Sequence, residues 1–64
     1  MDTMSAVSLS LSGEELTVFA ELLEGEHAQL LVEIRHTDRR SFREELRRRL
    51  VIIEHLLDQC RVAA

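Results

Sequence analysis

Apolar residues recur at steps of three and four along residues 42–60, which is the spacing of one face of an α-helix. This stripe consists of Phe42, Leu46, Leu50, Ile53, Leu57 and Cys60. A second stripe with the same spacing consists of Leu16, Ala20, Leu23, His27, Leu30 and Ile34. The pattern predicts an all-α protein with two amphipathic helices, at about residues 13–35 and 39–61.

The two predicted helices match as an antiparallel hairpin that turns near residue 38. Folding the chain there places Leu16 opposite Cys60, Leu23 opposite Ile53, Leu30 opposite Leu46 and Ile34 opposite Phe42. The apolar stripes then face each other along their whole length, as such a hairpin requires. One alternative stays open, in which residues 35–41 remain helical and two long helices dimerise end to end.

Local signals place the first helix more firmly than the second. Ser12 and Glu15 have the spacing of a capping box, in which each side chain bonds the backbone amide of the other. For the second helix, Thr37 or Asp38 can serve as the cap, and Ser41 with Glu44 offers a later capping box.

The chain divides into two segments at the first helix. Residues 1–11, in which Val7, Leu9 and Leu11 alternate with serines, are expected to form a flexible or extended N-terminal arm. Residues 12–64 are expected to form the helical hairpin.

A hairpin of this length has a small core and needs additional stabilisation. The chain has 64 residues and one cysteine, so an internal disulfide is excluded, and it has no zinc-finger cluster. Oligomerisation is the remaining source of additional stability. The simplest form is a homodimer that forms a four-helix bundle, and a tetramer would be an extension of it. The residues expected in the core or the dimer interface are Leu16, Leu23, Leu30, Ile34, Phe42, Leu46, Leu50, Ile53 and Leu57.

Some apolar residues lie outside the two stripes. They are Val18, Leu22 and Val32 in the first helix and Val51 and Ile52 in the second. These side chains are either scattered exposed residues or a second surface that contacts a partner. Gly25 falls on the same side of the first helix, where it is either a tolerated exposed glycine or a point of close helix approach.

Glu26, His27 and Arg49 form a predicted polar cluster at the middle of the hairpin, because the fold brings residues 26 and 49 to the same level. The simpler interpretation is a partly buried ion pair that fixes the register, with His27 in the core. The alternative is a polar pocket that binds an anion or responds to pH through His27.

Two further kinds of ligand are weaker hypotheses. Glu24 and His27 have the Glu-x-x-His spacing of dimetal helical bundles, and Glu54 is the nearest additional carboxylate, but this spacing is common in helices rich in glutamate. Six arginines at positions 39–49 could bind nucleic acid, although no aromatic residue accompanies them and the net charge is −4. No cofactor is expected.

The function expected from these patterns is a non-enzymatic, homo-oligomeric helical hairpin that binds another protein. No nucleophile–base pair or phosphate-binding loop is recognisable, so no catalytic residue is predicted. The first eleven residues make a poor signal peptide, no apolar run has the length of a membrane span, and a lone cysteine fits a reducing compartment. A cytoplasmic protein is therefore expected.

Overall fold

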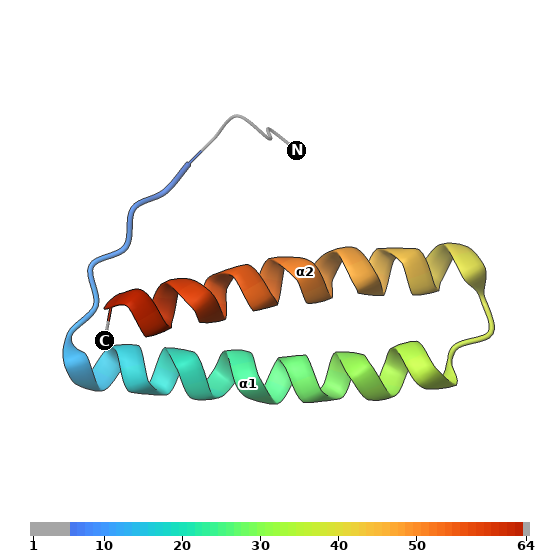
Figure 1. Cartoon of the computed structure of the whole chain (residues 1–64), viewed down its shortest axis with the longest axis horizontal. Helices are drawn as coiled ribbons and strands as arrows, with labels where there is room; N and C mark the ends of the chain where they lie inside the picture. The colour runs from blue at the N-terminus through green and yellow to red at the C-terminus, as the bar shows by residue number, and fades with distance from the viewer. Residues whose placement is uncertain (1–5, 64) are drawn as a thin grey trace.

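A computed structural model describes residues 6–63 of the chain, which form two helices packed side by side (Figure 1). Helix α1 spans Gly13–His36, and helix α2 spans Arg40–Ala63. The predicted all-α, antiparallel helical hairpin is confirmed, with helix ends that lie within two residues of those expected. The alternative of one continuous helix is excluded, because residues 37–39 are not helical.

The capping box predicted at the start of α1 is confirmed. The backbone N–H of Glu15 donates to Ser12 Oγ at 3.2 Å, and the backbone N–H of Ser12 donates to Glu15 Oε1 at 2.9 Å. These two bonds satisfy backbone donors that have no partner within the helix. Glu14 and Glu15 also place negative charge at the positive end of the helix dipole.

The turn between the helices is organised by Arg43 rather than by a side-chain cap on α2. Thr37 is extended and donates its backbone N–H to the carbonyl of Glu33 at 3.0 Å, which ends α1. Arg43 Nη2 donates to the Thr37 carbonyl at 2.7 Å, while its buried Nε has no partner within residues 6–63. The capping predicted for Thr37, Asp38 or Ser41 is absent from the described hydrogen bonds, since α2 begins at Arg40.

The core lies along the line where the helices face each other, and it is small. Four apolar side chains are buried within residues 6–63: Leu23, Leu30, Leu46 and Cys60. Leu30 is completely inaccessible to solvent. The other positions expected in the core or the dimer interface are half-buried, namely Leu16, Ile34, Leu50, Ile53 and Leu57, except that Phe42 is exposed.

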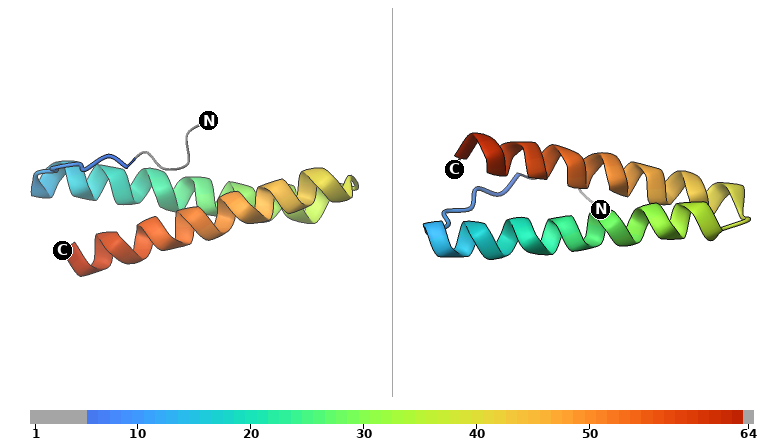
Figure 2. Two further views of the ribbon diagram at one scale, coloured as in Figure 1. Left: turned by 90° about the horizontal axis from the view of Figure 1, so that it is seen from above. Right: turned by 60° about the horizontal axis from the view of Figure 1, so that its bottom comes forward.

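The hairpin is elongated and is one layer of helices thick. Its principal extents are 40 × 27 × 15 Å, and its radius of gyration is 13.7 Å, whereas a compact domain of this length has about 11 Å. Seen from above, the two helices separate toward the end at which α1 begins and α2 ends (Figure 2). Within residues 6–63, each helix therefore packs against only one other helix.

The chain ahead of α1 has no regular secondary structure from Ala6 to Leu11, and it runs back over the hairpin (Figure 1). Val7 and Leu9 remain 84% and 71% exposed, so this arm is held by few contacts. The predicted arm extends over residues 1–11, of which residues 1–5 lie outside the described part of the chain.

Candidate interaction surface

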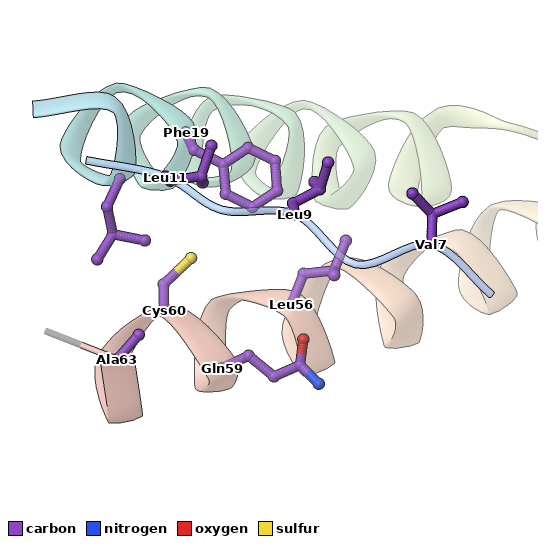
Figure 3. Close-up of a pocket in the computed structure, with 9 residues that line it drawn as sticks. Val7, Leu9, Leu11, Phe19, Leu56, Gln59, Cys60 and Ala63 are labelled. Carbon is purple, nitrogen blue, oxygen red and sulfur yellow. The ribbon is translucent and has the colours of Figure 1, made fainter. Parts of the chain in front are cut away.

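An apolar cavity lies between the N-terminal arm and the open end of the hairpin (Figure 3). It has a volume of about 270 Å³ and is lined mainly by apolar side chains. Its walls are formed by the arm and by both helices. They consist of Val7, Leu9 and Leu11 of the arm, Leu16 and Phe19 of α1, and Leu56, Gln59, Cys60 and Ala63 of α2. This side of the hairpin, which carries Phe19 and Leu56, is called the arm face below.

The arm face continues past the cavity toward the turn. Residues seven apart lie almost above one another on a helix, so the stripe of Phe19 leads to Glu26 on α1. By the same spacing, the stripe of Leu56 leads to Arg49 and then to Phe42 on α2. Phe42 is 44% exposed and lies at the turn end of this stripe.

The polar cluster predicted at mid-height is arranged differently from the expectation. Glu26 is half-buried and Arg49 is exposed, and within residues 6–63 no ion pair joins them. His27 instead contacts Glu54, with Nε2 and Oε2 3.1 Å apart. The hairpin therefore brings Glu26 and Arg49 to the same level on the arm face but leaves both without the predicted partner.

The metal candidates Glu24, His27 and Glu54 lie together on the opposite side of the hairpin. They border a polar hollow of about 510 Å³ that Asp58 and Arg61 also line. Even so, among residues 6–63 no group of three or more His, Cys, Asp or Glu side chains could hold a metal ion. The three carboxylates around this hollow also disfavour an anion.

The arginines of α2 leave the helix in several directions, although Arg40 and Arg47, which are seven residues apart, share one side. Arg40 pairs with Glu44 at 3.6 Å, and Arg43 is turned into the loop. Arg47, Arg48 and Arg49 are exposed but consecutive, so their side chains leave the helix about 100° apart. A phosphate backbone would therefore meet the charges of Arg47, Arg48 and Arg49 in three directions.

A second exposed apolar stripe runs along the outward side of α1. Val18, Leu22 and Val32 are 50%, 68% and 52% exposed. Val18 and Leu22 lie on adjacent turns, and Val32 lies almost three turns further along the same side of the helix. On α2, Val51 and Ile52 are consecutive and therefore point about 100° apart. Only Ile52 lies toward the arm face, since it precedes the cavity-lining Gln59 by seven residues. The five residues expected to form a partner surface thus belong to more than one side.

Gly25 lies within the outward stripe of α1 and has open space around it. An added Cβ at this position would meet nothing within 4 Å. Gly25→Ala is therefore expected to raise the free energy of unfolding by about 1 kcal/mol, because alanine loses less backbone entropy in a helix. Urea denaturation checks this, with the exposed Ala28→Gly change in the same helix as the matched control of opposite sign. A destabilised Gly25→Ala protein would contradict it and indicate a close neighbour in solution.

Sequence reasoning did not anticipate the cavity beneath the arm. The alternation of Val7, Leu9 and Leu11 with serines suggested an extended segment, but nothing in it indicated which side of the hairpin the arm follows. Cys60 lies at the inner wall of this cavity and is 8% exposed, as expected of a small core residue.

Neither helix within residues 6–63 has the combination of length and apolar character needed to cross a lipid bilayer. No protein-family model, curated protein or solved structure matches the chain.

Proposed function

We propose that the chain is a non-enzymatic interaction protein, which forms a homodimeric four-helix bundle and in that form binds another protein. The observation that carries this proposal is the area that a single hairpin leaves exposed. The chain exposes 5690 Å², whereas a compact monomer of 7.4 kDa exposes about 4200 Å².

The excess of about 1500 Å² is larger than the roughly 800 Å² that each partner buries in a standard protein–protein interface. The exposed surface of the hairpin includes many large apolar side chains, among them Phe42, Leu22 and Ile52. Covering one side of each hairpin with a second copy would bury such residues and give each helix a second neighbour. The exposed apolar area thus supports oligomerisation or binding as the chain's activity.

The surface proposed for the other protein is the part of the outward stripe of α1 that carries Val18, Gly25 and Val32. In a bundle closed through the arm face, Val18 and Val32 would stay accessible, with Gly25 between them allowing a close approach. Glu14 and Glu21 lie beside this stripe. An amphipathic helix with an apolar stripe and flanking basic residues would fit it best.

The experiment compares the wild-type chain with a Val18→Gln, Val32→Gln variant in co-purification from the source cells. Glutamine keeps the helix and removes the apolar contacts. We expect a stoichiometric partner with the wild type and its loss with the variant, while both remain dimeric by sedimentation. Val62→Gln, at an 89% exposed position of α2, is the matched control and should retain the partner. Equal partner recovery with the wild type and the double variant would contradict the proposed surface.

A further inference from the structure

We propose that the second copy docks on the arm face with both turns at the same end of the bundle, so that Glu26 of each copy pairs with Arg49 of the other. This inference rests on the dimer proposed above and specifies its register. The basis of this inference is the position of Glu26 and Arg49. The single hairpin places these two opposite charges at the same height but does not join them in an ion pair.

Glu26 and Arg49 lie beside the arm face of the hairpin. Glu26 is half-buried and one seven-residue step from Phe19, which lines the cavity on the arm face. Arg49 is exposed and one such step from Leu56, which lines the same cavity. Both charges therefore flank the same face of the hairpin, one on each helix, near mid-height.

A symmetric dimer can use the arm face in two ways. A two-fold axis parallel to the helices sets α1 of one copy beside α2 of the other and keeps both turns at one end. Levels then match as they do within one hairpin, so Glu26 and Arg49 of the second copy differ in height by about one residue, or roughly 1.5 Å. The combined length of the Glu26 and Arg49 side chains spans the distance between the two facing helices.

The opposite docking, with turns at opposite ends, sets each helix beside its own copy. Glu26 lies within two residues of the midpoint of Gly13–His36, so full overlap brings the two Glu26 side chains within about 5 Å along the axis. The two Arg49 side chains then approach each other as well. Like charges at an interface are unfavourable, whereas the first docking forms two opposite-charge pairs.

The apolar residues of the arm face agree with the same register. With both turns at one end, Phe19 meets Leu56 of the second copy, and Leu22 meets Ile52 of the second copy. The ion pairs are thus bordered by apolar contacts, which exclude water and strengthen them. The arm crosses the open-end half of this face, but Val7 and Leu9 are too exposed to hold it strongly against a second copy.

The test measures the dimer dissociation constant by sedimentation equilibrium for Glu26→Arg, for Arg49→Glu and for the double reversal. Each single change creates two like-charge contacts and should weaken the dimer at least about tenfold. The double reversal restores opposite charges and should return the constant to within about threefold of wild type. Glu21→Arg and Arg48→Glu make the same charge changes on outward positions and are the matched controls.

Cross-linking gives an independent readout of orientation. Ile52 lies within one residue of the midpoint of α2, so Ile52→Cys in a Cys60→Ala background would form a disulfide between copies only in the opposite docking. We expect no such disulfide. A wild-type dimer that the single reversals leave unchanged, or that Ile52→Cys cross-links, would overturn this register while leaving the dimer intact. A wild-type monomer would instead overturn the proposed function itself.

Discussion

Replacing Leu30 by alanine is expected to lower the free energy of unfolding by about 3–5 kcal/mol. Leu30 is completely inaccessible to solvent at the centre of a core that contains three other buried side chains among residues 6–63. Truncation removes apolar contacts and leaves a cavity that two long helices cannot easily close. Since small domains are stable by only about 5–15 kcal/mol, the variant should lose much of its helix content near room temperature.

The matched control for this variant is Leu31→Ala. Leu31 is the next residue of α1 and is 40% exposed, so its truncation should cost less than about 1 kcal/mol. Circular dichroism during urea denaturation measures both variants. Equal effects of the two changes would contradict the described packing of α1 against α2.

Replacing Ile52 by aspartate is expected to weaken the dimer at least about 100-fold, which corresponds to about 2.7 kcal/mol. The arm face would cover Ile52 in the bundle, and an unpaired carboxylate buried there has no compensating partner. The single hairpin should tolerate the change, because Ile52 is 59% exposed in it.

Val51→Asp is a stringent control for this effect. Val51 is the preceding residue and is 64% exposed, so exposure in the single hairpin does not distinguish the two positions. It points about 100° away from Ile52 and off the arm face. Sedimentation equilibrium should show dissociation for Ile52→Asp only, and equal dissociation constants for the two variants would contradict closure through this face.

The hairpin itself could be predicted because its signals are local or periodic. The capping box at Ser12 depends on four consecutive residues, and the matching of the stripes depends only on helical spacing and the position of the turn. Leu23, Leu30 and Leu46 were placed on the facing sides in this way, and all three are buried.

The side-chain arrangement was harder to predict, because the height of a residue along the hairpin does not determine the direction in which its side chain points. Reasoning from the turn placed Glu26 level with Arg49, but level does not say whether the side chains point at each other or flank one face. Phe42 shows the same ambiguity, since it is exposed although it lies only about 40° around α2 from the buried Leu46. The contact of His27 with Glu54 required the crossing of the helices to be known.

Sedimentation equilibrium of the wild-type chain over a range of concentrations measures whether the chain forms a dimer. We expect a reversible equilibrium whose main species has twice the chain mass of 7.4 kDa, with a melting temperature that rises with concentration. A helical, cooperatively unfolding protein that stays at 7.4 kDa at every concentration would contradict it.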